Sequence, residues 1–358
     1  MTQGRKIFKK IGRIFLWLLV SIVSLVILLF IFINLPLGRK FIRNQAQSYL
    51  QGKLKTKVEI GSLDFRLPQW IELKNVYIED QHKDTLLYGR VLRVDLHMLK
   101  LISGNTDIEQ IYLNRILINI NRPETDSVFN YQFIIDAFSG NNPSTPNTDT
   151  SAMKLTLSRL TLDTVALNFK DKYAGNDFYA GIKKLDVKMD KFQPDRMNFQ
   201  VKDINADGID YFMTTYKQQQ YPDAPVAVDT IRNVSYPLLV ITKKLDLRNV
   251  NVQLDNKVSG MLYQNKVTHI LSTNSLFNMS TTSGTTDEIF IDSTTIAYTA
   301  PKSTDPKINT DTTSAGGSMS WMFAAKNLRI GNSDIKYDDN NKPAAEGLDF
   351  AHLDLKKL

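Results

Sequence analysis

The sequence predicts a mainly β protein in which an N-terminal transmembrane helix and a short amphipathic helix precede an elongated repeat β-sheet, folded into a groove. Three observations carry this prediction. Residues 14–35 form a run of 22 positions without a charge. From Val58 onward the apolar residues change from helical to alternating spacing. One apolar pattern then recurs along the chain at nearly constant steps.

The basic charge of the chain is concentrated at its N-terminus. The net charge is +7, but residues 1–57 contain eleven Lys and Arg residues and no acidic residue. Residues 58–358 hold 33 basic and 37 acidic residues, which gives this part a net charge of −4. An acidic body argues against nucleic acid as a partner. The absence of cysteine excludes disulfides, thiolate metal sites and a cysteine nucleophile.

The first 35 residues are predicted to form a cytoplasmic basic tail (1–13) and a transmembrane helix (14–35). At about 1.5 Å per residue, this helix would reach about 33 Å and cross a hydrocarbon core of about 30 Å. A cleaved signal peptide would have a shorter apolar run, of ~7–15 residues, and a small-residue cleavage site. We therefore expect an uncleaved single-pass anchor, with the N-terminus in the cytoplasm and the body translocated.

Residues 36–57 are predicted to form a membrane-proximal amphipathic helix. The apolar residues Phe41, Ile42, Ala46, Tyr49 and Leu50 can share one face. Arg39, Lys40, Arg43 and Gln47 fall largely elsewhere. The helix could lie on the membrane surface, with its cations beside anionic headgroups. It could equally cap the first strand of the β body, and both roles could hold at once.

The recurring pattern reads apolar, x, apolar, x, x, apolar, x, apolar. Its copies begin at residues 71, 111, 155, 199, 245, 289 and 323, so the steps are 40, 44, 44, 46, 44 and 34. The copy at Ile289, Ile291, Ile296 and Tyr298 is degenerate because it has extra spacing. The residues expected to line a groove are Ile71, Leu73, Val76, Ile78, Ile111, Leu113, Ile116, Ile118, Leu155, Leu157, Leu160, Leu162, Leu245, Leu247, Val250 and Val252.

Internal similarity at a longer distance supports the repeat. A shift of 168 residues places 160–187 on 328–355 without gaps, so that Leu160 meets Leu328 and Leu167 meets Ile335. The two adjacent x positions reverse the alternation, so a bulge or tight turn is needed if both halves are to face one side. A sheet with one apolar face must fold over itself, add a partner or leave a groove for lipid. An ordinary sandwich or solenoid with a dry core is the alternative.

The pattern divides the β body into segments. We expect a first β-groove segment at 58–138, a linker at 139–152 and a β-repeat segment at 153–298 with an irregular insertion at 214–237. A second linker at 299–320 and a truncated β-repeat at 321–358 follow. The interruptions are rich in Ser, Thr, Asn, Pro and Gly, as expected of loops. We expect the chain to be a fragment or an abbreviated relative of a longer protein.

No constellation in the sequence indicates catalysis, a metal or a cofactor. The histidines His82, His97, His269 and His352 have no ligand-like neighbour at helical spacing. A nucleophile-elbow GxSxG sequence is absent, and the carboxylates are scattered. We therefore expect a protein that is not an enzyme and has no cofactor.

A single N-terminal span is followed by VEIG at 58–61, LKNV at 73–76 and DTLLY at 84–88. In this order of features, residues 35–96 resemble the N-terminus of AsmA-like proteins, in particular the TamB (translocation and assembly module) branch. Later segments (NFKD, IKKLDV and EGLDFAHLDL) resemble the recurring strand units of that family. The chain departs from full TamB proteins because it lacks their long repeat extension and C-terminal domain.

The resemblance implies a single-pass protein of the cell inner membrane with a periplasmic β-groove body that takes part in outer-membrane biogenesis. One expected function is to carry phospholipid along the apolar groove. A second is to assemble outer-membrane proteins by binding client β-strands, which would make such a protein the partner. A third is a structural tether without cargo.

Overall fold

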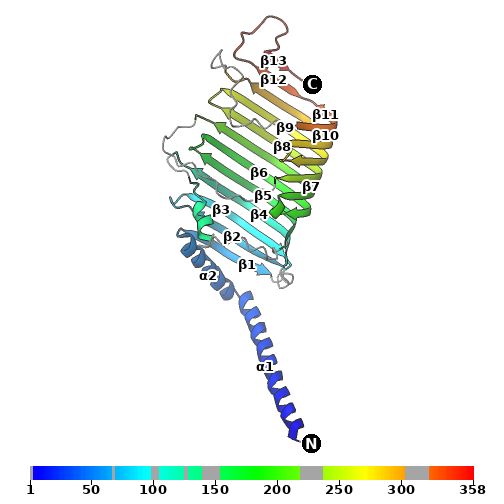
Figure 1. Ribbon diagram of the computed structural model, residues 1–358. Helices are drawn as coiled ribbons and strands as arrows, with labels where there is room; N and C mark the ends of the chain where they lie inside the picture. The colour runs from blue at the N-terminus through cyan, green and yellow to red at the C-terminus, as the bar shows by residue number, and fades with distance from the viewer. Residues whose placement is uncertain are drawn as a thin grey trace.

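The computed structural model describes residues 3–66, 69–97, 105–124, 128–138, 154–217, 237–302 and 322–358. Within these residues the chain forms one continuous β-sheet, and helix α1 (Gln3–Asn34) extends away from its N-terminal end (Figure 1). The prediction of a mainly β protein is confirmed. The expected linker 139–152 lies outside the described residues, as do most of the expected insertion at 214–237 and linker at 299–320.

Two helices precede the sheet. Helix α1 begins at Gln3, so the residues predicted as a separate tail are helical, because lysine, arginine and isoleucine all fit a helix. Leu35 adopts extended angles, φ −74° and ψ 151°, because Pro36 disfavours a helical residue before it. Helix α2 (Pro36–Leu54) ends earlier than predicted, since Lys55 is left-handed at φ 53°. Among the residues described, no helix is both long and apolar enough to cross a membrane.

The sheet contains thirteen strands, which neighbour one another almost in sequence order. A short helix, α4 (Gln132–Phe138), lies in the connection after β4. The strands are β1 (Val58–Arg66), β2 (Trp70–Glu79), β3 (Thr85–Leu96), β4 (Asn105–Arg122), β5 (Lys154–Asp171), β6 (Asn176–Gln193), β7 (Asn198–Thr215), β8 (Leu239–Asn256), β9 (Met261–Asn278), β10 (Ser283–Thr299), β11 (Met322–Gly331), β12 (Asp334–Asp338) and β13 (His352–Leu355).

The repeating unit is a three-stranded meander joined to the next by a parallel seam. Parallel pairing occurs between β4 and β5, between β7 and β8, and between β10 and both β11 and β12. All other neighbours are antiparallel. The seven copies of the apolar pattern therefore lie on strands that run in one direction, which explains their nearly constant step. Equivalent seam residues Thr164, Asn249 and Asn332 lie 85 and 83 residues apart, in agreement with the 168-residue shift.

Two lines of irregular pairing cross the sheet. Along the first line, one residue of each strand has no paired partner in the neighbouring strand. These unpaired residues include Gly61, Asn75, Arg90, Arg115, Thr164, Lys183, Gly208, Asn249, Thr268, Ser293 and Asn332. Seven of these residues are left-handed, with φ between 47° and 70°. Along the second line, the unpaired residues include Glu109, Ser158, Lys202, Lys243, Asn274, Asp287 and Lys326. These are the bulges that the doubled x positions predicted.

The complete strand pattern is longer than the one found in the sequence. In β5 the positions on one face are 155, 157, 160, 162, 165, 167 and 169, and the same spacing describes β7, β8 and β10. The four-position copies that begin at 71, 111 and 245 span the first bulge line, whereas those at 155, 199 and 323 span the second. The copy at Ile289 has no extra spacing, because Thr294 occupies its third position; this corrects the sequence interpretation.

Thr164 offers a test of the bulge geometry. Its φ of 58° disfavours a β-branched residue, whereas asparagine occupies the equivalent positions 249 and 332. Because left-handed angles cost an L-residue about 1–2 kcal/mol, Thr164→Asn should stabilise the β4–β5 seam by about 1 kcal/mol. Amide hydrogen exchange of Val165 would measure this. The control Thr214→Asn, at a residue with ordinary strand angles, should not stabilise the sheet, and a loss of protection in Thr164→Asn would contradict the assignment.

Helix α2 covers the free edge of β1. Arg43 Nη1 donates to the carbonyl oxygen of Gly61 at 2.9 Å, and Gln51 Nε2 donates to that of Val58 at 2.9 Å. Between them, the Ile60 N–H donates to Gln47 Oε1 at 3.1 Å. These three side chains are spaced four residues apart and form one stripe on the helix. Of the two roles expected for this helix, the structure therefore contains the capping of the first strand.

Candidate functional site

One face of the sheet carries rows of mainly apolar side chains. Directly paired residues share a face, so rows can be followed from ladder to ladder. The central row contains Leu63, Leu73, Leu92, Leu113, Leu162, Leu185, Ala206, Leu247, Ile270, Ile291 and Ile330. One neighbouring row contains Phe65, Ile71, Val94, Ile111, Leu160, Val187, Ile204, Leu245, Ser272, Ile289 and Leu328. All sixteen predicted groove residues lie in these rows or in rows parallel to them, which we call the apolar face.

Side-chain contacts across the bulge lines show that the rows point to the same side. A Cβ atom added at Gly89 would lie 2.5 Å from Leu92 Cδ1 and 2.8 Å from Ile116 Cδ1. Gly89 and Leu92 are three residues apart and would face opposite sides in a regular strand. Across the second line, the hydroxyls of Ser272 and Ser275 are 2.7 Å apart. The two lines of bulges thus keep the apolar face continuous over the full width of each strand.

No second layer packs on the apolar face within the described part of the chain. Apart from neighbouring strands, the main contacts are those of α2 with β1, α1 and α4. Leu113 and Leu162 are accordingly half-buried, and in the last long strand Leu328 is 57% and Ile330 is 52% exposed. This arrangement differs from a filled sandwich, in which the apolar rows of two sheets would cover each other.

Aromatic side chains mark both margins of the apolar face. Near one end of the strands, Phe169 stacks on Phe178 at 4.6 Å between ring centroids, and Tyr298 stacks on Tyr337 at 5.9 Å. Phe129, from the segment before α4, packs on Phe169 at 5.5 Å. The opposite margin contains Phe192, Phe199, Phe277 and Phe323. The central rows are almost wholly aliphatic, so the apolar face has an aliphatic centre bordered by aromatic side chains.

A patch of hydroxyl groups interrupts the apolar face at β8–β10. Ser272 Oγ lies 2.7 Å from Thr286 Oγ1, and Ser275 Oγ donates to Thr286 Oγ1 at 3.2 Å. Thr242 is buried nearby in the row of Ser275, whereas Thr294 is buried in the row of Val267 and donates to Asn265 Oδ1 at 3.0 Å. The apolar periodicity did not reveal these residues, although their places in the complete strand pattern would identify them. The hydroxyls satisfy one another, which lets them lie among apolar side chains.

The opposite face is polar and its charges are largely paired. Arg159 pairs with Asp186 at 2.5 Å, and Asp246 accepts from Arg248 at 3.2 Å and lies 3.0 Å from His269. The pKa of Asp246 is lowered because the hydrogen bonds from Arg248 and His269 outweigh the opposing effect of burial, which is the largest single contribution. Two hollows of about 540 and 570 Å³ lie mainly among the side chains of this face. We find no catalytic arrangement there.

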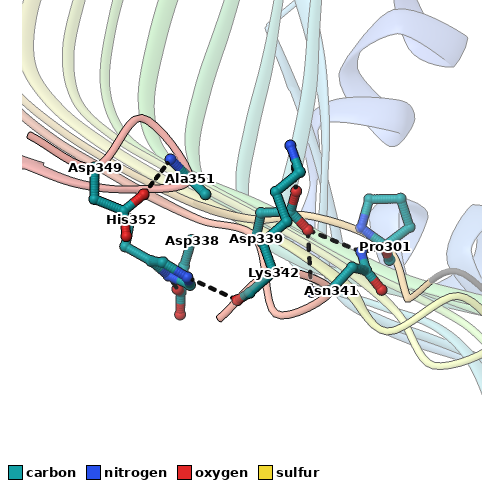
Figure 2. A network of polar contacts seen from close by, with 8 residues as sticks. All are labelled: Pro301, Asp338, Asp339, Asn341, Lys342, Asp349, Ala351 and His352. Carbon is teal, nitrogen blue, oxygen red and sulfur yellow. Dashed lines mark hydrogen bonds and ion pairs between the residues drawn. The ribbon is translucent and has the colours of Figure 1, made fainter. Parts of the chain in front are cut away.

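The turn between β12 and β13 holds a network of charged hydrogen bonds (Figure 2). His352 Nδ1 lies 2.5 Å from Asp338 Oδ1, and His352 Nε2 lies 3.0 Å from the carbonyl oxygen of Lys342. Both ring nitrogens can donate only when the imidazole is protonated, and the bond to Asp338 is the main reason why the pKa of His352 is raised. Asp349 accepts from the N–H groups of Ala345 and Ala351, which lowers its pKa.

The directions of these two pKa shifts predict that the order of the β12–β13 turn depends on pH. The raised pKa of His352 contributes stability that is complete below about 6.5 and is lost as the pH rises through the folded-state pKa. The lowered pKa of Asp349 contributes stability that is lost at acidic pH, as the pH falls through its folded-state value. We expect Ala351 amide exchange, corrected for intrinsic rates, to be slower at pH 6 than at pH 8.5. His352→Gln should remove this difference and His97→Gln should retain it; equal behaviour of the two would contradict the assignment.

Neither clusters of metal-ligating side chains in the described residues nor comparisons with known proteins indicate a further site. The described residues contain no group of three or more His, Asp or Glu side chains arranged to hold a metal ion. No family model, curated protein or solved structure matches this chain.

Proposed function

We propose that this chain is an inner-membrane-anchored periplasmic protein of the AsmA/TamB type that carries phospholipid along its apolar face during outer-membrane biogenesis. It acts as a carrier rather than an enzyme. The observation that supports the proposal is the continuous, uncovered apolar face, which extends from Leu63 in β1 to Ile330 in β11.

The energetics favour acyl chains as the occupant of this face. Removing a methylene group from water contributes about 0.8 kcal/mol, so an acyl chain lying on the central aliphatic rows gains several kcal/mol. Monomeric soluble proteins rarely leave apolar patches of this extent open to water. The aromatic margins suit the boundary between acyl chains and the wet headgroup region, because their rings are amphipathic.

The anchor supplies the lipid source. Residues 14–35 are apolar in sequence, and the described side chains of α1 from Leu16 to Phe32 contact no other part of the protein closely enough to be buried. We propose that this segment spans the inner membrane. The first strands of the sheet would then lie next to the outer leaflet, and the later strands would lie farther from it.

Site-specific photocrosslinking tests the proposal. A photoreactive residue at Leu113 or Leu247, on the apolar face, should capture phospholipid in cells, as identified by mass spectrometry of the purified adduct. The matched controls are Leu117 and Leu271, which lie on the polar face of β4 and β9. Equal capture at all four positions, or none at Leu113 and Leu247, would refute the carrier function.

The open edge of the sheet favours a second candidate, the assembly of outer-membrane proteins. Strand β11 pairs with β10 on one side, and no described strand pairs with its other edge. Such an edge can accept a client β-strand. Photoreactive residues along Met322–Gly331 that capture unfolded outer-membrane proteins, together with an absence of lipid at Leu113, would favour this function over lipid transport.

A further inference from the structure

A basic cavity lies where the two helices meet the first strand. It has a volume of about 480 Å³, and its helical lining includes Asn34, Arg39, Lys40 and Arg43, while residues 61–64 of β1 complete it. Asp64 is the only carboxylate in this lining. Arg39 and Lys74 each pair with Asp64 at 3.2 Å, so its charge is already balanced. The cavity therefore has an excess of positive charge.

Two donors in the cavity have unused hydrogen-bonding capacity. The Nε–H of Arg39 is buried and has no acceptor within hydrogen-bonding distance among the described residues. Because this atom is shielded from solvent, an oxyanion in the cavity would accept from it after a shift of the guanidinium, and the gain would be the satisfaction of a buried donor. The ammonium group of Lys40 is exposed and takes part in no ion pair or hydrogen bond with that part of the chain. Arg43 differs, because its guanidinium already donates to Gly61 and to Asn44.

The cavity adjoins the beginning of the apolar face. Leu63, which lines the cavity, is the first residue of the central apolar row. The Arg39 guanidinium lies 5.4 Å from the ring centre of Phe65, the first residue of the neighbouring row. Phe65 is itself buried beneath Arg39. A molecule bound here can therefore place a charged group against Arg39 and Lys40 and an apolar chain against Leu63.

We infer that this cavity binds the phosphate of an anionic glycerophospholipid and is the place where lipid is loaded onto the apolar face. The inference rests on the proposed lipid-carrier function and adds its loading site and headgroup preference. Arginine suits phosphate because its planar guanidinium presents several donors, and lysine adds a point charge. Acyl chains alone would not distinguish lipids by headgroup, whereas this cavity would favour phosphatidylglycerol over phosphatidylcholine.

The test uses the full chain in nanodiscs of equal phosphatidylglycerol and phosphatidylcholine, with a photoreactive residue at Ser62 in the cavity lining. Mass spectrometry of the adduct should find phosphatidylglycerol enriched roughly tenfold: both lipids present the phosphate, but only phosphatidylcholine also brings a quaternary ammonium against Arg39 and Lys40, and such like-charge contacts cost at least about a factor of ten. Arg39→Gln with Lys40→Gln should bring the ratio close to one. Lys53→Gln with Lys55→Gln, which removes the same charge from the far end of α2, should preserve the enrichment.

The outcomes separate this inference from the carrier function. Enrichment that survives Arg39→Gln with Lys40→Gln, or that is lost equally in the control pair, overturns the loading site. A second photoreactive residue at Leu113 reports on the apolar face: lipid captured there without enrichment at Ser62 leaves the carrier function standing alone. Inorganic phosphate that abolishes capture at Ser62 at millimolar concentration would identify a general phosphate site and overturn the lipid assignment. Circular dichroism of each variant confirms that the sheet is retained.

Discussion

Leu113→Asp is expected to reduce the phospholipid that co-purifies with the protein by roughly tenfold or more. A carboxylate among acyl chains costs several kcal/mol, and each 1.4 kcal/mol is a factor of ten in binding. Leu113 lies in the central row, paired with Leu92 and Leu162, so a charge there interrupts the apolar face across the middle of the sheet. Lipid extraction followed by mass spectrometry measures the loss.

The control for this experiment is Leu117→Asp in the same strand. Leu117 is, like Leu113, a half-buried leucine, but it pairs with Ala166 on the polar face. It should retain lipid close to the unmodified level. If both variants lose lipid equally, the loss reflects damage to β4 rather than a blocked apolar face.

Asp171→Ala is expected to be the most destabilising single change at a parallel seam. Arg122 Nε donates to Asp171 Oδ1 at 2.8 Å, and the two side chains are only 18% and 7% exposed. The guanidinium lies between the rings of Phe129 and Tyr173, at 4.5 and 4.8 Å from their centres. The hydrogen bond to Asp171 is the main reason why the pKa of Arg122 is raised. Removing the carboxylate leaves a buried cation without its partner, which costs roughly 2–4 kcal/mol.

Amide hydrogen exchange can locate that loss. The N–H of Lys172 donates to the carbonyl oxygen of Arg122 at 3.0 Å, so its protection reports on opening of the seam. The control is Asp163→Ala, which removes a half-buried carboxylate that accepts from the neutral amide of Asn114 at 2.9 Å between the same two strands. It should cost less than Asp171→Ala, because it leaves no buried cation without a partner. Equal losses would show that the Arg122–Asp171 pair has no special role.

The sequence was sufficient to predict the apolar face but not the topology of the sheet. Alternation and the doubled x positions placed Leu113 and Ile116 on one face, because the side-chain period of a strand is a local property. The parallel seams depend on contacts between residues 39 to 49 positions apart, such as Asn114 and Asp163, and no local pattern specifies them. The same four-position pattern occurs at both bulges of a strand. The sequence alone therefore does not show which of the two bulges a given copy spans.

Two parts of the candidate site were hidden for physical reasons. Thr294 and Ser272 occupy apolar positions with hydroxyl side chains, so a search for apolar residues passes over them. Gln47 and Gln51 protect the edge of β1 through backbone hydrogen bonds, and a glutamine on an amphipathic helix usually indicates only a solvated face. The cations of the basic cavity form a cluster in the sequence, but the sequence does not show that strand β1 lies against them.

The three-stranded unit lets the protein set its length independently of its cross-section. Adjacent strands are about 4.8 Å apart, so each unit of 83–85 residues advances the sheet by about 14 Å. Because the units from β5 to β10 share the two lines of bulges and the same spacing of apolar positions, duplicating or deleting one would change the reach of the molecule in fixed increments while preserving the width of the surface that it presents.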